Sequence, residues 1–157
     1  MSAMRRFFIL ACVCCLAGVT APATAATGRI IKVLPQFVDL HGRRSLSPSL
    51  YERDAYQAFL LAHPDRCSRL DFIVQWKARG GVYAPLKIRV EMMGTSTGDL
   101  PTRKVLEKVV NQHGWWSHWT SLKLDVNAYE ELGRVTAWRV TLWEGDELRG
   151  EQRSFLW

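Results

Sequence analysis

Residues 70–78 read LDFIVQWKA, and this stretch decides the fold. Two sets of side chains alternate along it: Leu70, Phe72, Val74 and Trp76 on one side, and Asp71, Ile73, Gln75 and Lys77 on the other. A period of two residues predicts a β-strand, because successive side chains of a strand point to opposite faces. Gly80 and Gly81 follow, which predicts a turn at the end of the strand.

Residues 86–92 repeat this pattern, with Lys87, Arg89 and Glu91 at the polar positions. A charged outer face is expected of an antiparallel sheet that has water on one side. Four further strand candidates follow after short gaps: 103–110, 121–126, 135–143 and 147–156. Several short strands at such spacing predict a mainly β, antiparallel β-sandwich.

The last two strand candidates are predicted to form a hairpin. Residues 143–147 lie between them, and Gly145 would supply the unusual backbone angle of the turn. The alternation in 135–143 makes Trp138 a candidate for the core. Near the other end of the chain, 30–40 is predicted to be an edge strand, because Pro35 has no N–H to donate within a sheet.

A single short helix is predicted over 50–62. Ser49 and Glu52 have the spacing of a capping box, and Pro64 ends the helix. The side expected to pack on the protein carries Tyr51, Ala55, Ala58, Phe59 and Ala62.

A resemblance to a known architecture follows from these elements. Six or seven short strands, a buried-type Trp on an early strand and Tyr129 within 128–133, just before the penultimate strand, resemble an immunoglobulin or fibronectin type III-like sandwich over 70–157. The inter-sheet cysteine pair of antibody domains is absent. Residues 138–143 and 154–157 are also similar to exported bacterial proteins of uncharacterised function, which implies no activity.

The N-terminus predicts a secretory signal peptide over 1–25. Arg5 and Arg6 are followed by the apolar run 7–19 and by the small residues 20–26. The expected cleavage before Ala26 leaves one domain, 26–157, in the periplasm or outside the cell, with no transmembrane segment. The alternative is a lipoprotein anchored at Cys12, but the apolar segment before that residue is short.

Cleavage changes the cysteine count and the charge. Cys67 alone remains of 4 cysteines, so it is either buried and inert, which we favour, or paired between molecules. Loss of Arg5 and Arg6 leaves 19 basic against 15 acidic residues, a formal charge of +4. A charge this small, without a block of like charges, argues against a nucleic acid partner.

The segment 94–98, GTSTG, fits the G-x-S-x-G elbow of serine hydrolases, with Ser96 as the nucleophile. That elbow needs a helix immediately after the serine. Here 99–101 read DLP, which favours a loop. We therefore expect no catalysis at Ser96.

Residues 113–119, HGWWSHW, form the most unusual stretch. Trp115, Trp116 and Trp119 either cover one end of the sandwich as core, which the pattern favours, or form an exposed platform for a sugar ring or a peptide. His113 and His118 belong to the same candidate binding set. Their spacing does not match the i, i+4 pair of a helical zinc site, so no metal and no cofactor are expected.

The sequence therefore favours a non-catalytic binding or structural module with an unknown protein or glycan partner in the cell envelope. Two alternatives stay open: a small secreted hydrolase or metal-dependent enzyme, and an envelope-assembly or adhesion subunit joined through edge strands. Five carboxylates are expected on the solvated surface: Asp39, Glu52, Asp54, Asp65 and Asp71.

Overall fold

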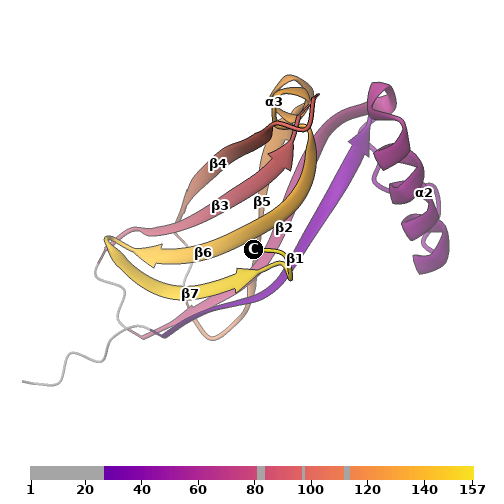
Figure 1. Ribbon diagram of the computed structural model, residues 1–157. Coiled ribbons are helices and arrows are strands. Elements are labelled where there is room, and N and C mark those ends of the chain that lie inside the picture. The colour runs from indigo at the N-terminus through magenta and orange to yellow at the C-terminus, as the bar shows by residue number, and fades with distance from the viewer. Residues whose placement is uncertain (1–26, 81–83, 97, 112–113) are drawn as a thin grey trace, which may run out of the picture.

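The computed structural model describes residues 27–80, 84–96, 98–111 and 114–157. Within them, seven strands form two antiparallel sheets that pack face to face as a β-sandwich (Figure 1). One sheet has the order β1 (Thr27–Asp39), β2 (Cys67–Arg79), β5 (His118–Asp125). The other has the order β4 (Pro101–Val110), β3 (Leu86–Thr95), β6 (Arg134–Glu144), β7 (Glu147–Arg153). The helices are α2 (Leu50–Ala62), α3 (Val126–Leu132) and a 3-10 turn over Pro64–Arg66.

The core lies between the sheets, where the sequence alternation placed it. Phe72, Val74 and Trp76 of β2 are fully buried, as are Val90 and other inward residues of β3. The indole N–H of Trp76 donates to the hydroxyl of Thr120 over 2.9 Å, so the largest core side chain also has its polar atom satisfied. The strand predictions for 70–78 and 86–92 are confirmed.

The prediction of an edge strand around Pro35 is confirmed as well. β1 pairs with β2 on one side only, and its other side approaches β7 of the opposite sheet. Two glycines permit this approach: a Cβ on Gly28 would lie 2.6 Å from the Cβ of Arg149, and one on Gly150 would lie 3.0 Å from the carbonyl oxygen of Gly28. The two sheets therefore close against each other at this corner.

The C-terminal hairpin differs from the prediction only at its end. Gly145 has φ +56° in the turn, as expected, but β7 ends at Arg153 rather than at Leu156. Trp138 is half-buried and packs against the core. The chain leaves the sheet after Ser154, whose N–H donates to the carbonyl of Trp138 over 2.9 Å, and Phe155 is fully exposed.

Helix α3 was not predicted from sequence. Its first turn is capped by Asp125, whose carboxylate accepts from the N–H of Ala128 over 2.8 Å. Tyr129 and Leu132 of this helix are buried, and the ring of Tyr129 meets the edge of Phe37 with 5.3 Å between centroids. The helix thus covers the end of the core, between β5 and β6 in the chain.

Helix α2 begins and ends where the sequence predicted, but its cap and its orientation were predicted wrongly. The side chain of Ser49 makes no capping hydrogen bond, so the capping box with Glu52 does not form. The expected packing side is exposed, including Tyr51 at 84% and Phe59 at 42%. Leu60 is the buried residue of the helix.

Polar contacts at the free edge of β1 explain this orientation. The amide of Gln57 accepts from the N–H of Phe37 over 2.7 Å and donates to its carbonyl over 2.9 Å. The hydroxyl of Tyr56 donates to Asp39 over 2.7 Å. An edge strand has unpaired backbone groups, and these contacts hold α2 where it satisfies some of them.

Cys67 is buried and is a free thiol in the part of the chain that the structure describes. Burial raises the pKa of the Cys67 thiol, and the nearby carboxylates of Asp65 and Asp39 raise it further. The predicted signal peptide, Cys12 and the predicted cleavage site lie outside the described residues. No described helix has the length and apolar character needed to cross a bilayer.

Candidate binding surface

One end of the β1-β2-β5 sheet carries a row of cations on its outer face. Antiparallel partners share a face, and the register places Arg29 opposite Lys77, Thr27 opposite Arg79, and Lys32 opposite Gln75. The inward side of β2 holds Trp76 and the other core residues, so Lys77 and Arg79 point outward. We call the four cations Arg29, Lys32, Lys77 and Arg79 the basic row.

The basic row is open to solvent and has no carboxylate partner among the described residues. Arg29, Lys32 and Arg79 are exposed, and Lys77 is half-buried. None of the four takes part in an ion pair with another described residue. The positive charge at this end of the sheet is therefore not neutralised by the described part of the chain.

Three tryptophans lie next to the basic row. Trp115, Trp116 and Trp119, which we call the aromatic loop, are 77%, 82% and 51% exposed. The interpretation that they cover one end of the core is wrong, because Trp76 fills the core near this end and the loop lies outside it.

Local hydrogen bonds hold the aromatic loop beside the cations. The N–H of Gly114 donates to the carbonyl of Ala78 over 2.9 Å, and the amide of Gln75 donates to the hydroxyl of Ser117 over 3.0 Å. The guanidinium of Arg79 lies 4.7 Å from the centre of the Trp115 ring, which is a cation–π contact. Trp119 shares the outer face with Gln75, its partner across β2 and β5.

A recess of about 460 Å³ opens at the same end of the sheet. Its lining includes Arg29, Lys77 and Arg79 of the basic row, and Thr27, Gly28 and Ile31 complete it. The surface therefore combines positive charge, exposed indole faces and a concavity. These three features together suit a ligand that carries both negative groups and flat apolar faces.

Of the two histidines predicted with this loop, the described one does not join the surface. His118 is half-buried, its ring lies 5.3 Å from that of Trp76, and its Nε2 is buried without a hydrogen-bond partner in the described structure. Because neighbours along a strand face opposite ways, His118 and Trp119 point to opposite sides of the sheet. His113 lies outside the described residues. The described residues include no cluster of three or more His, Cys, Asp or Glu suited to a metal.

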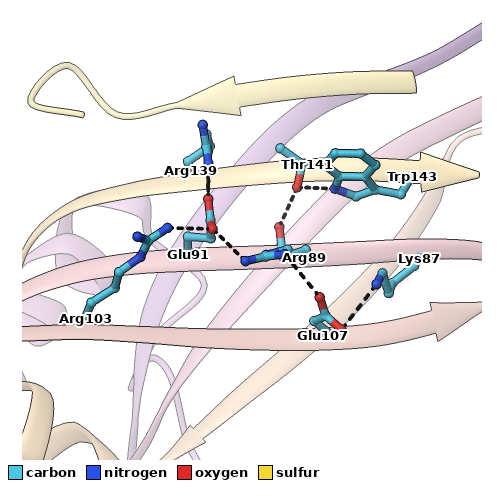
Figure 2. A network of polar contacts seen from close by, with 8 residues as sticks. All are labelled: Lys87, Arg89, Glu91, Arg103, Glu107, Arg139, Thr141 and Trp143. Atoms are coloured by element: carbon cyan, nitrogen blue, oxygen red, sulfur yellow. Dashed lines mark hydrogen bonds and ion pairs between the residues drawn. The ribbon is translucent and has the colours of Figure 1, made fainter. Parts of the chain in front are cut away.

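On the outer face of the other sheet, by contrast, a buried carboxylate is surrounded by arginines. Glu91 of β3 is only 2% exposed, although sequence alternation placed it in water. Figure 2 shows its carboxylate among three arginines: Arg89 at 2.9 Å, Arg103 at 2.8 Å and Arg139, whose Nε is 2.7 Å away. Burial alone would raise the pKa of Glu91, but the hydrogen bonds and charges of the arginines outweigh burial and lower it.

Two of the five carboxylates expected on the surface are also buried. Asp39 is 4% exposed and accepts from Tyr56, from Arg43 and from two backbone N–H groups. Burial would raise the pKa of Asp39, but these hydrogen bonds hold it well below its ordinary value. Asp71 is fully buried beneath Arg44 and Arg69. The other three, Glu52, Asp54 and Asp65, are exposed as predicted.

Ser96 has the surroundings of a turn. Its hydroxyl donates to the carbonyl of Leu100 over 3.4 Å, and strand β4 begins at Pro101. A turn over 98–99, followed by strand β4, therefore stands where a nucleophile elbow requires a helix.

Comparison with protein-family models, with curated proteins and with solved structures finds no match to this chain.

Proposed function

We propose that this protein is an exported, non-catalytic binding module whose ligand docks on the aromatic loop. The observation that carries the proposal is the exposure of three indoles at one end of a sandwich whose core has its own buried Trp76. Large aromatic side chains are costly to leave in water, and clustered exposure of this kind typically marks an interaction site.

The strand arrangement supports an immunoglobulin or fibronectin type III-like architecture. With the strands lettered A to G in chain order, the sheets are A-B-E and D-C-F-G. Immunoglobulin constant domains have A-B-E-D and C-F-G, so only the fourth strand changes sheet. Tyr129 lies between the fifth and sixth strands, close to the place of the corner tyrosine. Such sandwiches bind through loops and edges because their interior is filled.

The signal-like N-terminus supports export to the periplasm or the cell exterior, and a glycan or protein of the cell envelope is the expected partner. The alternative of a hydrolase has less support, because a turn and then strand β4 follow Ser96, and the Ser96 hydroxyl donates to the backbone carbonyl of Leu100.

Titration of tryptophan fluorescence with a panel of neutral glycans, acidic glycans and peptides tests the proposal. Binding is expected to shift the emission, and Trp116→Ala is expected to abolish the shift while changing the unfolding free energy by less than about 0.5 kcal/mol, as is usual for exposed positions. Trp143→Phe, on the outer face of the other sheet, is the matched control and should bind normally. Loss of stability in Trp116→Ala, or normal binding by it, would contradict the proposal.

A second candidate function is an assembly subunit, and the exposed face of α2 favours it. Leu50 and Tyr51 are 66% and 84% exposed on this helix. Self-association predicts a concentration-dependent mass in analytical ultracentrifugation that Tyr51→Lys abolishes. A constant monomer mass up to high concentration contradicts this candidate.

A further inference from the structure

The cations of the basic row repel one another across the paired strands β1 and β2. Arg29 and Lys77 face each other directly across β1 and β2, and Arg79 lies two residues further along the same face. Like charges at opposed positions of a sheet repel each other and weaken the pairing. Thr27 and Gln75, the remaining partners in these rows, are neutral, so the register provides no compensating carboxylate.

Repulsion of this kind is relieved when an anionic ligand binds between the cations. The ligand must present several negative groups, because the four cations occupy successive outward positions of two neighbouring strands. A single small anion would contact only part of the row. A polyanion that follows the strands would contact all of it and release counterions.

The adjoining indoles add a second requirement. The apolar face of a pyranose ring packs well on an indole. Trp115 stacks on Arg79 at one end of the row, and Trp119 lies beside Gln75, level with Lys32. The ligand that satisfies both requirements is a polymer of sugar rings that bear negative groups.

The recess beside β1 favours a chain-like ligand over a membrane surface. Arg29, Lys77 and Arg79 line a concavity of about 460 Å³, which a polymer segment can enter and a flat bilayer surface cannot. The formal charge of only +4 after removal of the signal, together with the expected export, makes an acidic glycan a better match than a nucleic acid.

We propose that the ligand of the aromatic loop is an acidic polysaccharide, held by the basic row through its carboxylate or sulfate groups and by Trp115 and Trp119 through its ring faces. This inference rests on the proposed binding function and specifies its ligand class.

Paired polymers with the same backbone test the charge requirement. Polygalacturonate is compared with its methyl ester, and dextran sulfate with dextran, by calorimetry and tryptophan fluorescence at low and at physiological salt. The acidic member of at least one pair is expected to bind, its affinity falling steeply with salt, and the neutral members are expected to bind at least tenfold more weakly. The two pairs distinguish carboxylate from sulfate as the recognised group.

Charge variants locate the binding. Lys77→Gln together with Arg79→Gln is expected to weaken binding of the acidic polymer by about tenfold or more, because charge-assisted hydrogen bonds are lost. Lys87→Gln together with Lys104→Gln is the matched control. It makes the same change in net charge at residues that are ion-paired with Glu107 and Glu131. Trp119→Ala is expected to weaken binding of the acidic polymer while leaving its salt dependence unchanged.

The outcomes separate this inference from the function on which it rests. Equal binding of neutral and acidic polymers overturns the acidic ligand but supports a glycan-binding loop. Binding only to phosphatidylglycerol vesicles, or only to oligodeoxythymidine, overturns the polysaccharide class. Equal weakening by the control variant shows a nonspecific charge effect and overturns the assignment to the basic row. If nothing in the wider panel of glycans and peptides binds, the proposed function itself fails.

Discussion

The basic row of the three-stranded sheet and the network around Glu91 on the four-stranded sheet both contain clustered cations, but only the second provides a carboxylate for them. On the four-stranded sheet, Glu91 is buried beneath three arginines, and Lys87 and Arg89 contact Glu107 (Figure 2). On the three-stranded sheet, Arg29 faces Lys77 and no described carboxylate neutralises the pair. These charges of the first face hold strands together, whereas the four cations of the basic row on the second face are available to a ligand.

The comparison shows that net charge by itself is a poor guide to a binding surface. The formal charge of the full sequence, +6, is modest when it is averaged over the 157 residues. The structure concentrates four unpaired cations at one end of one sheet, whereas Lys87, Arg89, Arg103 and Arg139 of the other sheet are paired with carboxylates. What matters for binding is which cations lack a carboxylate within reach.

Acid is expected to have the largest effect, because it acts on two buried carboxylates at once. The pKa values of Glu91 and Asp39 lie below their ordinary values of 4.5 and 3.8 in the folded protein. A lowered folded-state pKa stabilises the fold above the unfolded-state pKa and loses that contribution as the pH falls toward the folded-state value. The unfolding free energy should therefore decrease steadily from about pH 5 downward in denaturant titrations. A constant value between about pH 5 and pH 3 would contradict this expectation.

Glu91→Gln is the next largest change and acts on the four-stranded sheet alone. It leaves three arginines without their shared carboxylate. Breaking a fully buried pair costs roughly 3–5 kcal/mol, and we expect about 2 kcal/mol here because the arginines are partly exposed. Urea unfolding measures the loss. Glu107→Gln, whose side chain is 41% exposed, is the control and should cost less than about 0.5 kcal/mol. Similar losses in the two variants would remove the distinction between a buried and a surface network.

Lys77→Glu is expected to have the smallest effect on stability, and the effect should be favourable. It replaces a like-charge pair with an opposite-charge pair across from Arg29, worth about 0.5 kcal/mol. Lys32→Glu makes the same change in net charge opposite the neutral Gln75 and should leave stability nearly unchanged. Destabilisation by Lys77→Glu would show that the basic row is not repulsive, and the comparison between the two faces would fail.

Local patterns predicted much of the fold. The alternation in 70–78 and 86–92 correctly located two central strands, and Pro64 correctly marked the end of α2. Helix α3 was missed because seven residues are too few for a periodic signal, although Asp125 three residues before Ala128 is the spacing of its cap. The packing side of α2 was missed because apolar residues lie on several sides of this helix. The polar contacts of Tyr56 and Gln57 determine which side faces the sheet.

The candidate surface was predicted in part. The sequence singled out Trp115, Trp116 and Trp119, but it favoured their burial. It did not identify Arg29, Lys32, Lys77 and Arg79, which form no block in the chain. The outward alternation of Lys77 and Arg79 at the end of a strand was the available signal. Its meaning depended on the partner strand, whose register with β2 is not encoded in either segment alone.

The sequence by itself determined the class of fold, because alternation of apolar and polar residues lets one face of each strand be buried while the other contacts water. Only the tertiary structure decided how the outer charges are used. Arg139 reaches Glu91 across 48 residues of sequence, and Lys77 meets Arg29 across a similar separation. Electrostatic energy depends on distance in space, and pairing of remote strands sets that distance. Strand pairing also decides the exposure of Trp119, because the register places it opposite Gln75 on the outer face.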